Sequence, residues 1–276
     1  MSNQENKNTF ATVDSSTDPQ AFVQCLHEQY AHNTRLNLNK HETLNLMNLE
    51  PGQTVLDAGC GTGVDAVQMA QLVAPTGHVY GIDFSQEMIN AAIRHIAERD
   101  LPLTYQQGSI YALKFADNFF DRCRADKTFQ HLADPEAALG ELIRVTKPGG
   151  KIVIADPDHD SLIIDSPYPD ITRRFVRFRS DHMAQGGIAH QLYRMFKASG
   201  LMNVTVTPLT HVYTSYDEKK VSSPYLREIW LAHKHGVVDE DEAQRWASSL
   251  QEAIDKECFF CMQTYLVTTG EKHKLQ

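Results

Sequence analysis

Three glycines stand at alternate positions in the stretch VLDAGCGTGVD, directly after a short apolar run that includes Asp57. Because glycine has no side chain, the backbone at Gly59, Gly61 and Gly63 can approach a ligand closely. A helix that starts after such a turn offers its N-terminus to an anionic or polar group. Asp83 lies twenty residues after Gly63 at the end of the next apolar run, where a carboxylate would accept hydrogen bonds from ribose hydroxyls. The spacing therefore predicts a site for a nucleotide-like cofactor.

The order of these residues separates two classes of cofactor. The dinucleotide fingerprint G-x-G-x-x-G requires a glycine at position 64, but Val64 is there, which counts against NAD and FAD. The pattern D-x-G-x-G-x-G, followed by GIDFS and later by TKPGGKIVIAD, resembles the class I S-adenosylmethionine-dependent methyltransferases. The stretch FDRCRADKTFQHLADPEAALGELIRVTKPGG is similar to the fourth strand and following helix of one small-molecule group, which includes the ubiquinone and menaquinone methyltransferases. The resemblance covers residues 50–157.

The resemblance implies that S-adenosylmethionine is the cofactor and lies over the carboxyl ends of the first strands. The glycine loop would hold the methionine and ribose portions, and Asp83 would hold the ribose diol. Phe84 or Met88 would flank the adenine, and Ala125 would offer its backbone carbonyl to the amino group. Ser109 departs from the family pattern, because many relatives have an acidic residue there that contacts the adenine amine. The cofactor-binding residues implied in this way are Asp57, Gly59, Cys60, Gly61, Gly63, Asp83, Phe84, Met88, Ser109, Ile110 and Ala125.

Short apolar runs alternate with longer amphipathic ones from Thr54 to Val206, a pattern typical of βαβ units around a parallel sheet. We expect strands in TVLDAG, HVYGID, LTYQQ, FFDRCRA, KIVIAD and NVTVTPL, with helices such as SQEMINAAIRHIAERD and DPEAALGELIRV between them. The segment FFCMQTYLVTTGEK fits the last strand that the family implies. The predicted fold class is α/β: a doubly wound, Rossmann-like sheet of seven strands, the last antiparallel, with N-terminal helices and helical cap insertions.

The sequence predicts a division of the chain into five segments. Residues 1–17 are polar and are expected to form a flexible tail, and residues 18–49 to form N-terminal lid helices. Residues 50–157 are the predicted cofactor-binding core, and residues 158–199 a helical cap segment. Residues 200–276 supply the final strands, with a helical insertion at about 213–256. Long excursions beside a parallel sheet are typical of substrate lids.

The composition is that of a globular protein, with 276 residues, 42% hydrophobic and 22% charged. The formal net charge of −9 argues against a broad nucleic-acid footprint, which needs a basic face. No stretch approaches the roughly 18 to 20 apolar residues of a membrane span, and the start lacks the apolar core of a signal peptide, so we expect a cytoplasmic location. The five scattered cysteines are consistent with reduced thiols. Cys258 and Cys261 form a CxxC pair inside a predicted strand, where we interpret them as small hydrophobes rather than metal ligands.

Methyl transfer from a sulfonium depends mainly on orientation of the acceptor, because the leaving group is already activated. A general base helps a hydroxyl acceptor but matters little for a neutral amine or an electron-rich carbon. His131 and His159 follow the fourth and fifth strands, on the edge where ligands bind, although a packing role for the first and a solvated loop for the second remain open. Tyr30 would close over the cofactor with its ring toward the sulfonium, or pack in the helix beside Phe22 and Leu26. The candidate catalytic residues are His131, His159 and Tyr30.

A metal site is the weaker interpretation of the acidic residues around His159. Asp156, Asp158 and Asp160 offer oxygen ligands of the kind that Mg²⁺ or Mn²⁺ prefers. Closely spaced acids in a loop after a strand are more typically solvated or cap a helix. We therefore predict no metal.

Two further patterns lie in the predicted caps. Arg173 and Arg177 share one helical face and would suit a carboxylate or phosphate, or would simply be solvated. Trp230 and Trp246 would line an apolar substrate pocket, or bury the cap. The sequence leaves both pairs of alternatives open.

The predicted function is S-adenosylmethionine-dependent methyl transfer to oxygen, nitrogen or carbon of a small, partly apolar metabolite by in-line displacement. One alternative is a non-catalytic protein that keeps the cofactor fold and regulates a partner. Another is a protein or nucleic-acid methyltransferase, although ADKTF stands after the fourth strand in place of an Asn-Pro-Pro-Tyr-like tetrapeptide. The expected partner is the small-molecule methyl acceptor, with no nucleic acid and no membrane, and a homodimer is left open.

Overall fold

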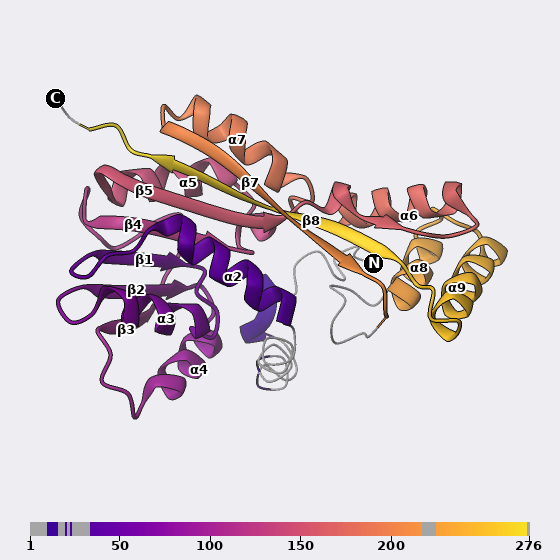
Figure 1. The fold of residues 1–276 in the computed structure, drawn as a ribbon, viewed down its shortest axis with the longest axis horizontal. Coiled ribbons are helices and arrows are strands. Elements are labelled where there is room, and N and C mark those ends of the chain that lie inside the picture. Colours follow the sequence, from indigo (N-terminus) through magenta and orange to yellow (C-terminus); the bar gives the residue numbers. More distant parts are fainter. Residues whose placement is uncertain (1–9, 16–19, 21–22, 24–33, 217–224, 275–276) are drawn as a thin grey trace.

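The computed structural model describes residues 10–15, 20, 23, 34–216 and 225–274 (Figure 1). These residues form an eight-stranded sheet in the order β3-β2-β1-β4-β5-β8-β6, with β7 also paired to β8. Strands β1 to β5 are mutually parallel, and β8 is antiparallel to β5, β6 and β7. The strands are β1 (Thr54–Ala58), β2 (His78–Asp83), β3 (Leu103–Gln107), β4 (Phe120–Asp126), β5 (Thr146–Pro157), β6 (Ile163–Ile164), β7 (Met202–Tyr213) and β8 (Cys261–Glu271).

The predicted α/β class with an antiparallel last strand is confirmed, and the predicted count of seven strands is short by one. The additional strand is β6, only two residues long, which pairs with the beginning of β8. So short a segment leaves no recognisable alternation in the sequence. The last strand begins at Cys261, so Cys258 lies before it and the predicted start of that strand was too early.

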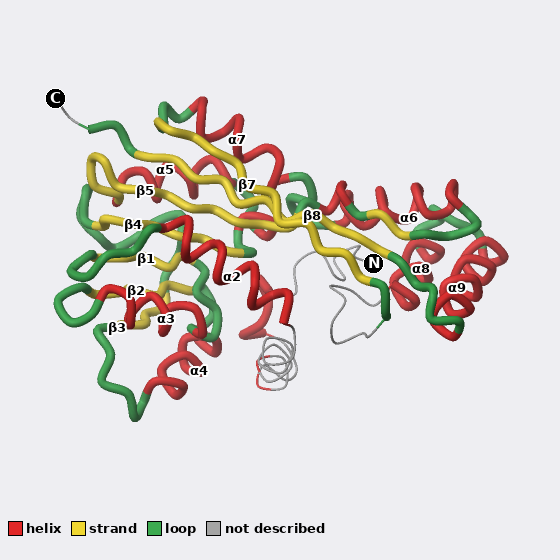
Figure 2. The backbone as a smooth tube through the Cα atoms, viewed as in Figure 1, coloured by secondary structure: helices red, strands yellow, loops and turns green. Residues whose placement is uncertain are grey.

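The helices cover the two faces of this sheet and build a lobe beside it (Figures 1 and 2). Three short 3-10 helices mark turns: η1 (Phe10–Ser15), η2 (Phe129–His131) and η3 (His159–Ser161). Local signals start several helices. The Ser85 hydroxyl accepts from the Met88 amide at the start of α4, and Asp134 does the same for the Ala137 amide of α5. The α-helices are α2 (Thr34–Met47), α3 (Val64–Val73), α4 (Gln86–Ile96), α5 (Pro135–Val145), α6 (Pro169–His182), α7 (Ile188–Ala198), α8 (Tyr225–Lys234) and α9 (Glu240–Asp255).

Two buried apolar clusters lie on opposite faces of the sheet, because successive side chains of a strand point to opposite sides. In β1, Val55 belongs to the cluster shared with α2, α3 and α4, while Leu56 belongs to the cluster shared with α5 and α7. Ile152 and Val153 divide in the same way along β5. The parallel strands are therefore apolar on both sides, which is why they appear as short continuous apolar runs in the sequence.

A third buried cluster lies outside the sheet, in a lobe that we call the cap: η3, β6, α6, α8, α9 and the adjoining ends of β7 and β8. Trp246 and Phe175, both fully buried, pack there with ring centroids 4.9 Å apart. Helices α6, α8 and α9 contact one another, whereas α7 packs on the sheet beside β5, β7 and β8. The predicted cap segment 158–199 is thus divided between the cap and the sheet.

The N-terminal part of the chain is described only in pieces. Residues 10–15, which fall in the predicted flexible tail, form η1 against α4, with Val13 and Val23 packed on Met88. Within the predicted lid helices, α2 packs Leu44 and Met47 on the sheet cluster. Tyr30 lies outside the described residues. None of the helices that are described is long and apolar enough to cross a membrane.

Candidate cofactor and acceptor site

The glycine loop between β1 and α3 turns through three left-handed residues, with φ of 77° at Gly59, 53° at Gly61 and 77° at Gly63. A β-carbon at Gly59 would overlap the side chain of Thr128, and one at Gly63 would overlap the ring of Tyr105. At Gly61, in contrast, no described atom outside Gly61 and its two chain neighbours lies within 4 Å of where a β-carbon would be. Two glycines therefore allow the loop to fold tightly, and the middle one faces open space that a ligand can fill.

Asp83 connects this loop to the end of β2. Its Oδ2 accepts a hydrogen bond from the Gly61 amide at 2.8 Å, and its Oδ1 accepts one from the Ser85 amide at 2.9 Å. Burial raises the pKa of Asp83, while these backbone donors act in the opposite direction. A carboxylate has about four lone-pair sites, so Asp83 can hold the loop and still accept hydrogen bonds from a vicinal diol.

A buried group of charges lies beneath the loop. Arg124, whose side chain is 2% exposed, donates from Nη1 to Asp57 at 3.0 Å and from Nη2 to Asp65 at 2.8 Å and Asp126 at 2.5 Å. Lys40 on α2 also pairs with Asp65, at 2.7 Å. Asp57 and Arg124 are register partners on β1 and β4, so the sheet itself sets this contact. The sequence pattern predicts that Asp57 binds the cofactor but gives no signal for Arg124, which lies in a buried strand.

The same network gives two aspartates opposite pKa shifts. Burial raises the pKa of Asp57 to about 6, because its one strong partner, Arg124, only partly offsets desolvation. Burial also acts on Asp65, but the attraction of Arg124 and then Lys40 outweighs it and lowers the pKa of Asp65 to about 2. Asp65 is therefore ionised at neutral pH, and Asp57 titrates close to the physiological range.

The residues predicted to lie beside the adenine differ in how exposed they are. Phe84 is 66% exposed and free to cover a flat ring, whereas Met88 is 3% exposed and packs under Val13. Ile110 is buried in the sheet cluster, and the Ser109 hydroxyl accepts from the Tyr111 amide. Ala125 is fully buried at the end of β4, and Cys60 is half-buried in the glycine loop.

The N-terminal 3-10 helix closes this side. The carboxylate of Asp14 accepts hydrogen bonds from the Ser85 hydroxyl and from the amides of Gln86, at 2.8 Å, and Glu87, at 3.3 Å. The two amide donors are the first N–H groups of α4, where a negative charge is favoured. Asp14 therefore fixes η1 next to the residues that follow Asp83.

Comparison with known proteins agrees with this geometry. The family model described as a methyltransferase domain matches residues 49–200, more than half of the chain. The chain belongs to the class I S-adenosylmethionine-dependent methyltransferases. It is 36% identical over 213 residues to an uncharacterised 37.1 kDa protein in a transposon of Streptomyces fradiae, a match that covers 76% of this chain and 61% of that protein. It is 29% identical over 204 residues to a demethylmenaquinone methyltransferase of Halalkalibacterium halodurans, with 65% of this chain and 83% of that protein covered.

Among solved structures, the methyltransferase fold is shared with a phosphoethanolamine N-methyltransferase 2 of Haemonchus contortus in complex with S-adenosylmethionine. The TM-score is 0.61 at 17% identity, with 98% of this chain and 61% of that chain covered. At that identity the likeness concerns the fold. The chain spans less than two thirds of the length of the Streptomyces relative as well.

S-adenosylmethionine is the cofactor of this methyltransferase, and the residues present fit it. The open space at Gly61 accommodates close approach of a ligand to the backbone, and Asp83 keeps lone pairs for the ribose hydroxyls. Phe84 offers an exposed ring at the adjoining strand end. The assignment of individual contacts to these residues remains a prediction.

The short helices η2 and η3, which follow β4 and β5, carry the two histidines that the sequence predicts on the acceptor side. His131 and His159 lie near enough for the charge of one to act on the other, and burial lowers the pKa of each to about 4. Gln130 connects the two turns, because its Oε1 lies 2.9 Å from Nε2 of His159 and its amide donates to the fully buried Asp156. The sequence singled out both histidines but not Gln130, which carries no signal until its neighbours are known.

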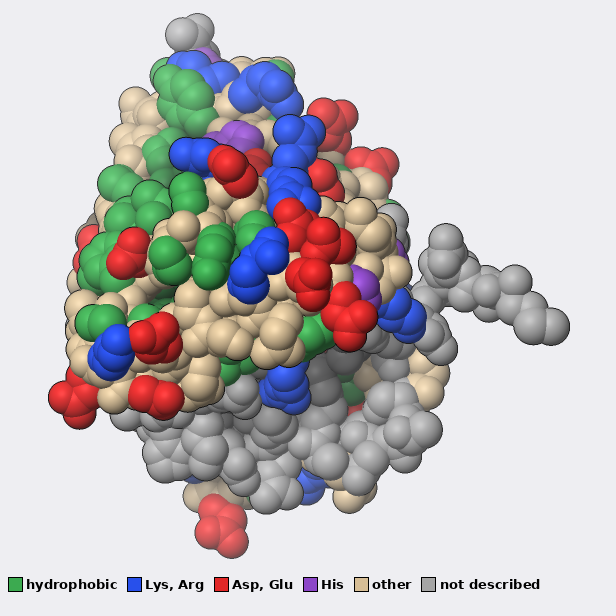
Figure 3. Space-filling model, turned by 90° about the vertical axis from the view of Figure 1, so that its right-hand side faces the viewer, with side chains coloured by type: hydrophobic (Ala, Val, Ile, Leu, Met, Phe, Trp, Pro, Cys, Tyr) green, Lys and Arg blue, Asp and Glu red, His purple; other side chains and the backbone are tan. Residues whose placement is uncertain are grey.

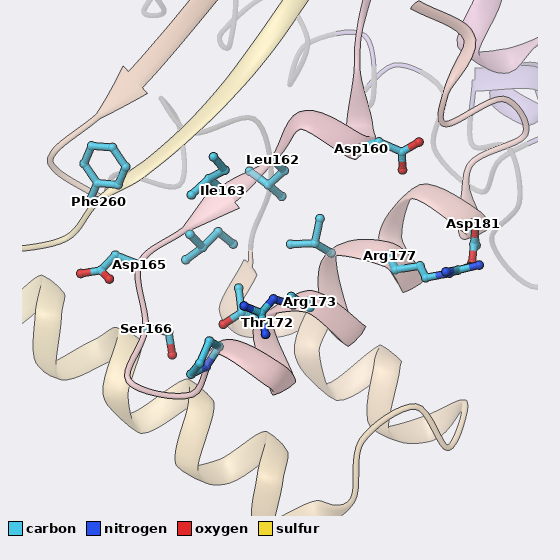
Figure 4. A pocket seen from close by; sticks show the side chains of 13 residues that line it. Asp160, Leu162, Ile163, Asp165, Ser166, Thr172, Arg173, Arg177, Asp181 and Phe260 are labelled. Atoms are coloured by element: carbon cyan, nitrogen blue, oxygen red, sulfur yellow. The ribbon is translucent and has the colours of Figure 1, made fainter. Parts of the chain in front are cut away.

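The other predicted patterns separate in space. Arg173 and Arg177 lie on the outer side of α6, along an open groove of about 960 Å³ that also includes Ile163 and Phe260 (Figure 4). That groove shares no residue with the glycine loop, and Arg173 pairs with Asp170 of its own helix. The structure does not bring these arginines to the predicted cofactor site.

The two tryptophans of the cap differ in their surroundings. Trp246 is fully buried and donates from Nε1 to the Thr172 hydroxyl at 2.9 Å, so it holds the cap together. Trp230 is 37% exposed and packs against the ring of His233. Of the acidic cluster, Asp158 and Asp160 come together with His190 within 4.8 Å, while Asp156 lies in the interior. The carboxylate of Asp158 already pairs with Nδ1 of His190, at 3.1 Å.

Proposed function

We propose that this chain transfers a methyl group from S-adenosylmethionine to a small, partly apolar acceptor molecule. The observation that carries the proposal is the open space at Gly61 beside the carboxylate of Asp83, at the carboxyl edge of β1 and β2. Ligands of doubly wound sheets bind at this edge. The demethylmenaquinone methyltransferase relative supports an acceptor with an apolar body and a polar ring, such as a quinol.

The cofactor, when bound, supplies an activated methyl group whose bond to sulfur breaks as the acceptor atom forms its new bond to carbon. The chain contributes orientation and exclusion of water. The glycine loop and Asp83 would hold the adenosyl and methionine portions, and the network around Arg124 keeps the loop and β4 in register. His131, His159 and Tyr30 remain the proposed catalytic residues on the acceptor side, where oxygen, nitrogen or carbon would be methylated.

The cap favours the proposal of a small acceptor molecule, because its separate apolar core packs on the adjoining ends of β7 and β8. We propose that residues 18–49 and the cap cover the acceptor, while residues 50–157 hold the cofactor. On the end of the molecule formed by the cap, acidic side chains gather beside basic ones (Figure 3), and Arg174 there pairs with Glu242. This mixed charge favours a small molecule over nucleic acid as the partner.

Calorimetric titration tests the proposal directly. We expect binding heat with S-adenosylmethionine and none with NAD. Asp83→Ala should weaken S-adenosylmethionine by about tenfold or more, since a hydrogen bond to a charged group contributes about 1.5–3 kcal/mol. Asp117→Ala is the matched control, because Asp117 is exposed and pairs only with Arg144 among the described residues. Equal affinity of the Asp83 variant and wild type would show that the ribose assignment is wrong.

A labelling experiment tests the alternative that the protein binds the cofactor without catalysing methyl transfer. A screen with methyl-labelled S-adenosylmethionine, kept below its dissociation constant, across metabolite extracts should give a labelled small molecule with wild type and about tenfold less with Asp83→Ala. Tight cofactor binding without any labelled product, in small-molecule, protein and nucleic-acid fractions alike, would favour the regulatory function instead.

A further inference from the structure

The turn that joins β2 to α4 is closed by side-chain acceptors. A helix start leaves its first four backbone N–H groups without a partner inside the helix. In α4 all four, counted from the N-cap, are bonded to side chains: Asp83 accepts from the amide of Ser85, Asp14 from the amides of Gln86 and Glu87, and the Ser85 hydroxyl from the amide of Met88. One of these acceptors, Asp14, comes from η1, at the other end of the cofactor-binding half in the sequence.

Ser85 connects the two carboxylates of this turn. It is 3% exposed, its hydroxyl donates to Asp14, and its amide donates to Oδ1 of Asp83 at 2.9 Å. A hydroxyl has one proton, so donation to Asp14 leaves its lone pairs for the Met88 amide, 3.1 Å away. Asp14 thus holds Ser85 in the position from which it caps α4 and bonds Asp83.

An apolar contact and a charge bring Asp14 to this place, although 71 positions separate it from Ser85. The adjoining Val13 is 2% exposed and packs with Met88 of α4. Burial acts to raise the pKa of Asp14, but the hydrogen bonds that it accepts at the start of α4 outweigh burial and lower that pKa. The carboxylate is therefore ionised at neutral pH, and a negative charge is favoured at a helix N-terminus.

We propose that Asp14 is a positioning residue for the cofactor, which acts through Ser85 to keep the carboxylate of Asp83 in place for the ribose hydroxyls. A group that is already ordered before binding loses less entropy when the ligand arrives, so a fixed turn raises the affinity. Because linkage is reciprocal, bound cofactor strengthens the docking of η1 by the same factor. This inference rests on the proposed function and adds a residue of the N-terminal segment that determines cofactor affinity.

Hydrogen exchange of the full chain, followed at single amides by nuclear magnetic resonance, tests the contact. Without ligand, the amides of Gln86 and Glu87 should exchange about fivefold faster in Asp14→Ala than in wild type, as expected when a charge leaves a helix N-terminus. S-adenosylhomocysteine should slow both amides further in wild type. Equal exchange in wild type and Asp14→Ala, or no response to the ligand that wild type binds, would overturn the proposal.

Calorimetry with S-adenosylhomocysteine tests the effect on affinity. Asp14→Ala should weaken binding by about fivefold, and Asp14→Asn, which keeps an oxygen acceptor but no charge, should weaken it less. Asp239→Ala is the matched control, because Asp239 caps α9 in the cap by accepting from the Glu242 amide at 2.7 Å. It should lose stability and keep its affinity within about twofold of wild type. Equal weakening by the two alanine variants would overturn the proposal.

A double-mutant cycle separates positioning from a direct contact with the cofactor. If Asp14 acts through Asp83, then Asp14→Ala should weaken binding by less than about twofold when Asp83→Ala is already present. The same fivefold weakening in both backgrounds would show that Asp14 acts elsewhere. Wild type that binds neither S-adenosylmethionine nor S-adenosylhomocysteine contradicts the proposed function and this inference with it, whereas binding by wild type with unchanged affinity in Asp14→Ala contradicts the inference alone.

Activity supplies a further readout once the label screen has found an acceptor. Asp14→Ala should raise KM for S-adenosylmethionine by about fivefold and leave kcat within about twofold of wild type, because it removes binding that the ground state and the transition state share. Asp14→Asn should restore part of the loss in KM. A fall in kcat with unchanged KM would contradict the proposal.

Discussion

The sheet and the cap of this methyltransferase are held together in different ways. Under the glycine loop, a buried arginine is surrounded by three carboxylates, and β1, β4 and α2 each contribute a member of the network. The cap has an apolar core around Trp246, with one largely buried pair, Arg179 with Glu228, and with Arg174 and Glu242 paired nearer the surface. The sheet therefore adds directional contacts between fixed partners to its two apolar clusters, whereas the cap depends mainly on apolar volume, which tolerates many sequences.

The largest effect that separates the two regions is expected from Asp65→Asn. This change removes a charge that both Arg124 and Lys40 contact, and loss of one partner of a buried pair costs about 3–5 kcal/mol. Urea denaturation should show that loss in the free energy of unfolding. Asp170→Asn is the control, because its pair with Arg173 is exposed and contributes about 0–1 kcal/mol. Similar losses in both variants would mean that the network does not stabilise the sheet.

A change of comparable size is expected in the cap. Trp246→Ala removes its largest fully buried side chain and should cost about 3–5 kcal/mol of unfolding free energy. Because we propose that the glycine loop and Asp83 bind S-adenosylmethionine, we expect its affinity to stay within about threefold of wild type by calorimetry. Loss of cofactor binding together with stability would show that the two regions fold as one unit.

Gly61→Leu tests whether the glycine loop of the sheet binds the cofactor. The new side chain would occupy the space that we assign to the cofactor, so affinity for S-adenosylmethionine should fall by about 100-fold or more, while the positive φ costs about 1–2 kcal/mol of stability. Gly140→Ala, on the surface of α5, is the control and should be neutral or stabilising by up to about 1 kcal/mol. Unchanged affinity for Gly61→Leu would place the cofactor elsewhere.

The smallest effect is expected from pH. Asp57 has its pKa raised to about 6, so its carboxylate becomes protonated as pH falls through that value and attracts a cationic sulfonium less. Affinity for S-adenosylmethionine should drop by about tenfold between pH 7 and pH 5, in line with a pKa change of about one unit. S-adenosylhomocysteine, which lacks the charge, should respond less, and Asp57→Asn should flatten the curve.

The titration of Asp57 also affects the free energy of unfolding, but there the lower pH is the stabilising condition. The unfolded Asp57 loses its proton near its model value of 3.8 and the folded one near 6, so the folded state holds the extra proton between these values. The contribution of Asp57 to the free energy of unfolding is therefore fully present below that window and is lost as pH rises through about 6. Asp65, with its pKa near 2, contributes above pH 4 and loses its contribution only in strong acid.

The sequence predicts the sheet well because each strand and the glycine loop carry local patterns. The runs around Val55 and Ile152 are apolar on both faces, and the glycines stand at fixed spacing. It does not predict Arg124, since its partners lie on other strands and a helix, nor the position of α7, whose amphipathic pattern fits a cap as well as a sheet. Gln130 is invisible for the same reason: its importance comes from a histidine 29 positions away.

Strand β8 belongs to both regions, and its first residues continue past the end of β5, where Cys261 to Thr264 pair with β7 on one side. On the other side, Cys261 and Met262 pair with β6, so the sheet continues into the cap through hydrogen-bonded strands. The hydroxyl of Tyr265 donates to Asp126 of the arginine network. Because Tyr265 stands between the part of β8 that pairs with β5 and the part that enters the cap, its ring places the strand shared by both regions in direct contact with the charges beneath the glycine loop.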